Sequence, residues 1–243
     1  MREGHQGTGP GAITPDGCAV DVYRRLAVGN EPDVIEAAVP AGATLLELGC
    51  GAGRVTRPLV ERGFAVTAVD ESAEMLHALR ERVPGVEAVR SPIESLDLGR
   101  RFDVVMLASY LVHTAEHRTR QALLETCRRH VSDDGCVLIQ REGEEWHLDV
   151  PRERRDAAGC TVRIVSAEPV GEGVNAILAE YDFPDGARWT QTFLSRPLSK
   201  EDFERHLGEA GLAVDTYLTG DGTWVRARPE SRWKRSRRDA ERR

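Results

Sequence analysis

The chain has 243 residues, of which 40% are apolar and 30% charged, and its formal net charge is −7. These proportions are typical of a globular protein, and the sequence has no run of about 18 apolar residues that could cross a membrane. The five cysteines are scattered without a C-x-x-C pair, and residues 1–17 contain no apolar signal segment, which argues against a disulfide scaffold, a zinc ribbon or secretion and predicts a cytoplasmic protein.

The charge is divided unevenly along the chain. Residues 226–243 contain nine basic and three acidic side chains, a local charge of +6, which leaves −13 on residues 1–225. An acidic body does not favour nucleic-acid binding, because phosphate contacts dominate that affinity. We therefore expect residues 229–243 to form a basic, disordered tail, with contact to RNA or an acidic partner through Trp233 as the alternative.

The first elements expected are short and helical. Residues 1–16 are rich in Gly and Pro and have little to bury, so they are predicted to be a disordered tail. Residues 21–28 and 31–39 favour two helices, the second with a proline in its first turn and Pro40 at its end. These helices predict a helical lid over residues 17–40.

Strands and helices alternate from residue 43 onward. Strands are expected at residues 44–48, 64–69, 86–89, 102–108 and 136–140, with helices at 54–62, 72–82 and 115–130 between them. This order is typical of a parallel, doubly wound α/β sheet with right-handed crossovers.

The pattern changes after residue 141. Residues 161–167, 175–182 and 187–196 alternate with Gly-containing turns and predict an antiparallel meander of three strands, an insertion over residues 160–197. A further helix at residues 199–210 and a hairpin at 212–219 and 223–228 close the chain. We therefore expect a single domain over residues 17–228.

A glycine-rich loop with two acidic neighbours carries the strongest functional signal. Gly49, Gly51 and Gly53 lie between an expected strand and helix, where the missing Cβ atoms let a ligand lie against the backbone and the helix N-terminus. Glu47 ends the first strand as a carboxylate suited to a cationic amine. Asp70 ends the next strand, where a carboxylate accepts hydrogen bonds from ribose hydroxyls.

The spacing of the glycines separates two nucleotide-site classes. A dinucleotide site has G-x-G-x-x-G, whereas this chain has G-x-G-x-G followed by Arg54. The carboxylate of Glu47 would repel a pyrophosphate and attract an ammonium group. The P-loop pattern is absent from the sequence, so a methionine-like tail fits this loop better than a diphosphate.

These motifs resemble those of a known family. L-L-E-L-G-C-G-A-G-R, starting at Leu45, and V-T-A-V-D-E-S, starting at Val66, are similar to the first two motifs of the class I S-adenosylmethionine-dependent methyltransferases. The resemblance continues through R-F-D-V-V and D-D-G-C-V-L-I, covers roughly residues 40–142, and extends loosely to 199–228. It implies a doubly wound, seven-stranded Rossmann-like sheet with a terminal reversed hairpin, the cofactor S-adenosyl-L-methionine and the product S-adenosyl-L-homocysteine.

The resemblance also implies roles for individual residues. The methionine part of the cofactor would contact the glycine loop, and its ribose would bind Asp70. Its adenine would contact the residues that follow the second and third strands. Many relatives have an Asp where this chain has Pro92. In this chain, Glu94 or backbone groups would therefore bind the adenine amine. The expected cofactor-binding residues are Glu47, Gly49, Cys50, Gly51, Gly53, Arg54, Asp70, Glu71, Met75, Ile93, Glu94, Ala108 and Ser109.

Candidates for catalysis are sought at the carboxyl ends of the strands. Methyl transfer from a sulfonium is an in-line displacement in which the protein mainly aligns the nucleophile. His113, after the fourth strand, is either a general base or a polar loop residue that packs in place. Tyr23, in the helical lid, is either a lid residue over the cofactor or part of the core.

The substrate is expected at the same edge of the sheet. The loop after the fifth strand is charged and aromatic and is either an acceptor-binding loop or an ordinary surface loop. Side chains two apart in the meander share one face, which forms either a roof over the acceptor or a dimer contact. The expected substrate-binding residues are Tyr110, Arg141, Trp146, His147, Trp189 and Gln191; no metal site is expected.

The sequence thus predicts an enzyme that transfers a methyl group from S-adenosylmethionine to an N or O nucleophile of a small-molecule metabolite, in natural-product tailoring. Two alternatives stay open: a non-catalytic protein that binds an adenosyl ligand, and an RNA methyltransferase that uses the basic tail. The expected partner is a small-molecule acceptor, without membrane or nucleic acid. The chain is expected to be a monomer or a homodimer.

Overall fold

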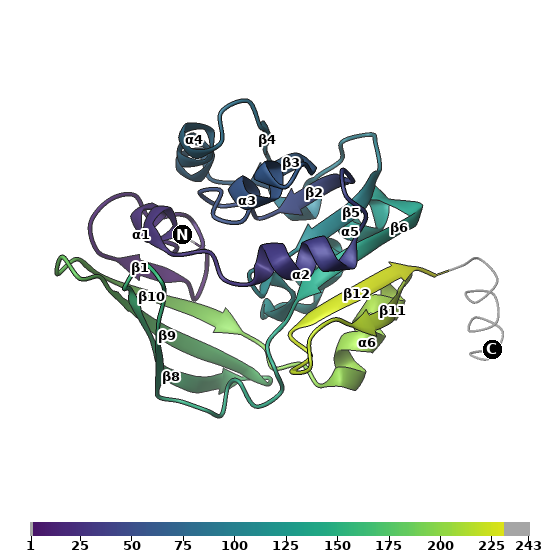
Figure 1. Ribbon diagram of the computed structural model, residues 1–243. Helices are drawn as coiled ribbons and strands as arrows, with labels where there is room; N and C mark the ends of the chain where they lie inside the picture. Colours follow the sequence, from purple (N-terminus) through teal and green to yellow (C-terminus); the bar gives the residue numbers. More distant parts are fainter. Residues whose placement is uncertain (1, 231–243) are drawn as a thin grey trace.

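A computed structural model of the chain describes residues 2–230 and contains two sheets (Figure 1). The larger sheet has seven strands in the order β11-β12-β6-β5-β2-β3-β4. Strands β2 to β6 pair with one another in parallel, and β12 is antiparallel to both β6 and β11. The strands are β2 (Thr44–Leu48), β3 (Ala65–Asp70), β4 (Glu87–Arg90), β5 (Phe102–Leu107), β6 (Val131–Gln140), β11 (Leu212–Tyr217) and β12 (Trp224–Pro229).

Helices cover both faces of this sheet, which explains why its strands are almost entirely apolar. Leu46 and Val105 belong to one core, with residues of α5 and α6, and Leu45 and Val104 to the other, with residues of α2, α3 and α4. Adjacent residues of a strand therefore serve opposite cores. The helices are α2 (Glu31–Ala38), α3 (Thr56–Glu61), α4 (Ala73–Arg82), α5 (His117–His130) and α6 (Lys200–Glu209).

Two of these helices begin at the side-chain caps expected from the sequence. Ser72 Oγ accepts the backbone N–H of Met75 at 3.1 Å, and Ser199 Oγ accepts that of Asp202 at 3.0 Å. The predicted doubly wound sheet and its reversed terminal hairpin are confirmed. Within residues 2–230, no helix is both long and apolar enough to span a bilayer.

The insertion forms a second, antiparallel sheet beside the first (Figure 1). Its order is β1-β10-β9-β8-β7. The predicted meander corresponds to its three long strands, and two short edge strands went unpredicted. The strands are β1 (Gln6–Thr8), β7 (Arg152–Arg155), β8 (Thr161–Gly171), β9 (Val174–Asp182) and β10 (Arg188–Ser195).

The N-terminal segment departs from the prediction of disorder for residues 1–16. β1 pairs with β10 over residues 6–8, and the Nε1–H of Trp189 donates to Pro10 O at 2.7 Å. The segment buries little by itself, but it completes hydrogen bonds along an otherwise open sheet edge. Helix α1 (Val20–Arg25) follows it. Of the predicted basic tail, residues 231–243 lie outside the described residues, whereas Pro229 ends β12.

Candidate functional site

The glycine loop and Asp70 form one hydrogen-bonded unit at the carboxyl ends of β2 and β3. The N–H groups of Gly49 and Cys50 both donate to Val69 O at 2.9 Å. The carboxylate of Asp70 accepts the N–H of Gly51 at one oxygen and the N–H of Ser72 at the other, each at 2.9 Å. Because a carboxylate oxygen has two lone pairs, each oxygen of Asp70 can accept one more donor.

The three glycines differ in what surrounds them, although all have a positive φ, at +76°, +54° and +77° for Gly49, Gly51 and Gly53. A Cβ at Gly49 would lie 2.8 Å from Leu111 Cδ1, and a Cβ at Gly53 would lie 2.5 Å from a leucine of α4. At Gly51 the nearest atom is Met75 Sδ, at 3.9 Å. The loop is therefore closely packed on two sides and open at its centre, where a ligand can approach the backbone.

Two buried carboxylates lie beside this loop. Glu47 accepts the hydroxyl of Thr56 at 2.6 Å, and burial raises the pKa of Glu47 to about 7. Arg54 pairs with Glu31 Oε1 at 2.7 Å, while Glu31 Oε2 is buried without a partner. Arg54 is thus held by α2, and Glu31, which the sequence analysis missed, adds an acceptor on the same side. These carboxylate acceptors fit a cationic ligand group.

The residues expected around the adenine lie near the N-terminal segment. Arg2 pairs with Glu71 at 3.0 Å and with Glu94 at 3.4 Å. Met75 is buried with residues of α1 and the glycine loop, and Ile93 Cδ1 lies 3.8 Å from the position of a Cβ on Gly49. The structure therefore brings these predicted positions together around the glycine loop. Arg2 lies over them and forms ion pairs with two of them.

A strained turn follows β5, directly after Ala108. Ser109 and Tyr110 have φ values of 54° and 61°, a conformation that costs energy for residues other than glycine and often marks a functional site. Gln140, at the end of β6, holds it: its Oε1 accepts the N–H of Ser109 at 2.9 Å, and its Nε2 donates to the hydroxyl of Tyr110 at 3.3 Å. Gln140 was not among the predicted residues, because only the pairing of β5 with β6 brings it here.

His113 has a structural position that argues against its role as a general base and for the alternative of a polar residue packed in place. Its ring contacts Arg196 O through Nδ1 at 2.8 Å and accepts the N–H of Glu142 through Nε2 at 2.9 Å. Burial lowers its pKa to about 4, so the ring is neutral and both nitrogens are occupied. We therefore assign His113 to joining β6 to the end of the insertion.

Side chains at the end of β6 and in the loop after it contact two different parts of the protein, helix α6 and the turn at Tyr110. Arg141 donates to Leu198 O at 2.7 Å, and its guanidinium lies 4.9 Å from the centre of the Phe203 ring. It therefore packs against α6, away from Tyr110. Gln140, the residue before it, holds the turn at Ser109 and Tyr110, and Glu142, the residue after it, lies near Tyr110.

The aromatic part of this loop contacts the insertion. The Arg152 guanidinium lies 4.3 Å from the centre of the Trp146 ring. His147 Nε2 lies 2.8 Å from the hydroxyl of Ser195, while its Nδ1 is buried without a partner. Burial lowers the pKa of His147 to about 4. These predicted substrate residues therefore lie at the junction of the loop with β7 and β10.

Tyr23 and Gln191 belong to a buried polar cluster between α1 and the insertion sheet. The thiol of Cys18 lies 3.4 Å from the Tyr23 hydroxyl, and Gln191 Nε2 donates to Cys18 Sγ at 3.2 Å. The Tyr181 hydroxyl donates to Gln191 Oε1 at 3.3 Å. Trp189 lies on the same sheet face as Tyr181 and Gln191. It packs edge to face on Phe183, 5.5 Å between ring centres, in a core that also contains Ala19 and Val22.

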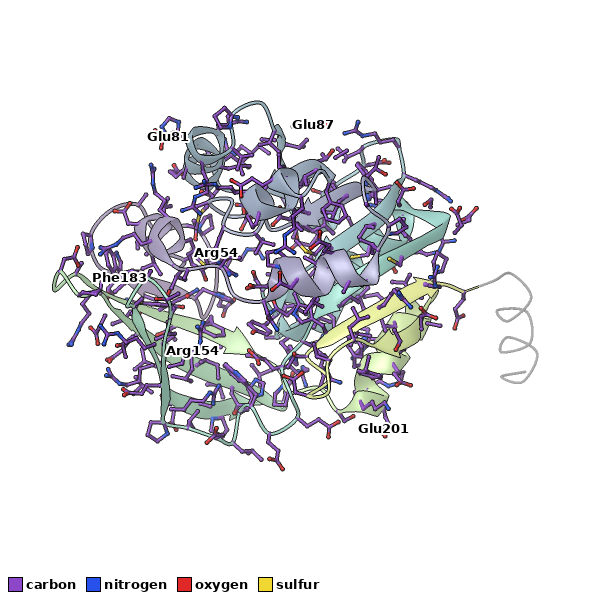
Figure 2. All side chains as sticks on the ribbon, viewed as in Figure 1. Arg54, Glu81, Glu87, Arg154, Phe183 and Glu201 are labelled. Atoms are coloured by element: carbon purple, nitrogen blue, oxygen red, sulfur yellow. The ribbon has the colours of Figure 1, made fainter. Side chains whose placement is uncertain are left out.

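One face of the insertion sheet is directed toward α1 and the loops after β5 and β6. Residues opposite one another on paired strands share a face, and the register places Arg154, Val162 and Tyr181 in one row and Arg152 and Gln191 in the next. Figure 2 labels Arg154 on this sheet and Arg54 on the glycine loop. We call these residues, together with Tyr110, Gln140 and Glu142, the inter-sheet region, because Arg154 acts on both Tyr110 and Glu142.

One further cluster has ligand types that bind metals. His117, at the start of α5, and His206 and Glu209, in α6, have ligand atoms within 4.8 Å of one another. The Glu209 carboxylate lies 3.3 Å from His117 and 3.1 Å from His206, so the three side chains already satisfy one another. The sequence analysis expected no metal site and did not anticipate this group.

Comparison with known proteins identifies the family. A family described as a methyltransferase domain matches residues 45–135. The dTDP-3-amino-3,6-dideoxy-alpha-D-glucopyranose N,N-dimethyltransferase of Streptomyces fradiae is 33% identical over 188 residues, which cover 72% of each chain. An uncharacterized methyltransferase of Mycobacterium tuberculosis is 39% identical over 94 residues, 38% of this chain and 39% of that one.

Solved structures show the same fold. The sugar N-methyltransferase KedS8 from Streptoalloteichus sp. superposes with a TM-score of 0.68 at 20% identity and covers 92% of this chain and 98% of its own. An S-adenosylmethionine-dependent methyltransferase from Clostridium acetobutylicum gives a TM-score of 0.69 at 16% identity, covering 87% and 97%. The chain therefore belongs to the class I S-adenosylmethionine-dependent methyltransferases. It is an enzyme, and its cofactor is S-adenosylmethionine.

Proposed function

We propose that this enzyme methylates the amino group of a small molecule, with an amino sugar as the favoured acceptor class. The observation that carries this proposal is the similarity to the Streptomyces fradiae N,N-dimethyltransferase over 188 residues. That alignment is about twice as long as the family match at residues 45–135. It therefore includes sequence beyond the segment that carries the cofactor motifs, where the acceptor is selected.

The cofactor side of the proposal is supported by the arrangement of charges and backbone groups. The two free lone pairs of Asp70 suit the ribose hydroxyls, and the open backbone at Gly51 suits the methionine part. Glu47 and the unpartnered Oε2 of Glu31 suit the ammonium group at the end of the ligand. Glu71, Met75, Ile93 and Glu94 would then surround the adenine.

The acceptor would occupy the inter-sheet region. This region includes the strained turn at Tyr110 and the sheet face that carries Tyr181 and Gln191. Strained turns persist where the surroundings hold them, and Gln140 provides that support. Tyr23 would cover the reacting centre from α1.

The proposed chemistry is an in-line displacement. S-adenosylmethionine supplies a methyl group on a sulfonium, which makes the group electrophilic. The chain's own residues orient the acceptor nitrogen toward that methyl group and keep water away. Such alignment can lower a barrier by roughly 7–11 kcal/mol. The main requirements for catalysis are therefore a rigid turn at Tyr110 and an acceptor that is covered by the insertion sheet.

A direct assay tests the proposal. The purified chain is incubated with S-adenosylmethionine and dTDP-3-amino-3,6-dideoxy-alpha-D-glucopyranose, and the products are examined by mass spectrometry. We expect the mass of the sugar to rise by one or two CH2 units, with S-adenosylhomocysteine formed in proportion. Methylation of the matching 3-hydroxy sugar instead of the amino sugar would refute N-methylation and support an O nucleophile.

A further inference from the structure

Glu142 is a buried carboxylate that nothing described so far uses. It follows β6 by two residues, and its N–H is fixed by His113 at 2.9 Å. Only 8% of its surface is exposed. Within residues 2–230, its side chain makes no hydrogen bond and no ion pair. Because a buried charge without a partner is costly, this carboxylate is placed to receive a ligand.

The groups around Glu142 come from three elements. Arg152 and Arg154 face it from β7, Tyr110 from the turn after β5, and His113 from the segment that follows that turn. The two guanidiniums act on it through space without forming an ion pair. Burial raises the pKa of Glu142 to about 8, and Arg152 and Arg154 oppose that rise.

Glu142 also lies close to the strained turn that follows β5. Glu142 follows Gln140, the last residue of β6, by two positions. Burial and the nearby Glu142 carboxylate both raise the pKa of Tyr110, so this carboxylate lies close to the turn. Gln140 holds Ser109 and Tyr110, so Gln140 and Glu142 both act on the turn that would hold the acceptor. Arg152 and Arg154, which act on Glu142, share their face of the insertion sheet with Tyr181 and Gln191.

We propose that the carboxylate of Glu142 binds the ammonium group of the acceptor and takes a proton from it. This inference rests on the proposed N-methylation and deepens it, because a buried carboxylate is complementary to an amine and poorly suited to an uncharged hydroxyl. The ligand class is a primary or secondary amine. Glu142 would thereby select the acceptor and prepare it for reaction.

The steps balance as follows. An R–NH3+ acceptor gives one proton to the carboxylate of Glu142, which leaves R–NH2 and a neutral carboxyl group. The nitrogen lone pair forms a bond to the methyl carbon while the bond from that carbon to sulfur breaks, and its electron pair stays on sulfur. The product R–NH2–CH3+ leaves with S-adenosylhomocysteine, and Glu142 returns its proton to solvent.

The test compares three variants with dTDP-3-amino-3,6-dideoxy-alpha-D-glucopyranose as acceptor. Glu142→Gln keeps the shape and removes the charge, and Glu142→Asp keeps the charge. Glu145→Gln makes the same charge change at an exposed position three residues along the loop. For each variant, kcat/KM is measured against pH, and S-adenosylmethionine binding is measured by calorimetry.

For Glu142→Gln we expect kcat/KM to fall about 100-fold, with S-adenosylmethionine affinity kept. The wild-type rise in kcat/KM as pH increases through about 8 should be lost in this variant. Glu142→Asp should restore part of the rate, and Glu145→Gln should resemble the wild type. Full activity and an unchanged pH profile in Glu142→Gln would overturn the inference and leave N-methylation standing, since wild-type turnover tests that separately.

Arg154→Gln provides a test that does not depend on the folding of the Glu142 variants. Arg154 lies on an edge strand, is exposed, and lowers the pKa of Glu142. Its removal should move the rise in kcat/KM to higher pH, with the plateau rate changed less. An unmoved pH profile in a folded, cofactor-binding Arg154→Gln variant would also overturn the inference.

Discussion

The proposed cofactor side and the proposed acceptor side of this enzyme are built in different ways. The cofactor side comes from neighbouring segments: the loop after β2 and the residue that ends β3 bond directly through Asp70 and Gly51. The acceptor side combines the ends of β5 and β6 with β7, α1 and the face of a second sheet. The first side depends on a short motif and the second on how distant segments meet.

This difference predicts where substitutions act. A change on the cofactor side should reduce S-adenosylmethionine binding whichever acceptor is used. A change on the acceptor side should alter turnover or pH dependence while cofactor binding stays. Four variants test this separation, from the largest expected effect to the smallest.

Asp70→Ala should have the largest effect. It removes the acceptor for the N–H groups of Gly51 and Ser72 and the partner proposed for the ribose. Loss of charge-assisted hydrogen bonds of this kind costs about 3 kcal/mol, or roughly 100-fold in affinity. Calorimetry with S-adenosylmethionine measures it, and Asp70→Asn, which keeps one acceptor oxygen, should lose less. Unchanged affinity in Asp70→Ala would remove the cofactor site from this loop.

His113 should affect stability and its pH dependence more than cofactor binding. Its pKa is about 4 in the folded protein because it is buried, and near 6.5 when unfolded. As pH falls below about 6.5 the unfolded chain takes up this proton and the folded chain does not. The free energy of unfolding should therefore fall by up to about 1.4 kcal/mol per pH unit between 6.5 and 4 from this residue.

The measurement for His113 is urea unfolding at several pH values. His113→Gln should be less stable at pH 7 by about 2 kcal/mol, since the N–H of Glu142 and Arg196 O lose good partners. It should also show a smaller loss of stability on acidification. If His113→Gln instead keeps its stability and loses turnover completely, the general base expected from the sequence would be restored.

Gly49→Ala should reduce S-adenosylmethionine affinity by about tenfold. The new Cβ would lie 2.8 Å from Leu111 Cδ1 at a φ of +76°, so both strain and contact oppose it, at about 1–3 kcal/mol. Gly63→Ala is the matched control, because its φ is +88° and no atom lies within 4 Å of the new Cβ. The control should lose stability but keep its affinity for the cofactor. Equal affinity losses in both variants would mean that backbone strain alone is responsible.

Gln140→Ala should have the smallest effect of the four, a several-fold fall in kcat. The substitution releases the N–H of Ser109 and the hydroxyl of Tyr110, and one hydrogen bond contributes about 1 kcal/mol. Steady-state kinetics with the amino-sugar acceptor measures it. A loss of S-adenosylmethionine binding larger than the loss of kcat would place Gln140 on the cofactor side.

The sequence was sufficient for the cofactor side because its signals are local. The glycine spacing, Glu47 and Asp70 lie within one strand–loop–helix–strand unit, and the alternation of strands and helices predicted the parallel, doubly wound sheet. The N-terminal segment was predicted wrongly, because residues 6–8 become a strand only by pairing with β10. Likewise Arg141 looked suited to a ligand, but the pleat turns it toward Phe203.

By itself, the sequence determined the doubly wound fold and the conformation of the loop proposed to hold the cofactor, since periodicity and glycine geometry act over a few residues. Only the tertiary structure decided that both nitrogens of His113 are occupied and that Glu142 is buried without a partner opposite Arg154. Those properties depend on contacts between residues far apart in the chain, such as Arg196 with His113. Burial and hydrogen bonding set the protonation state of a side chain, and both are established only after the two sheets have packed.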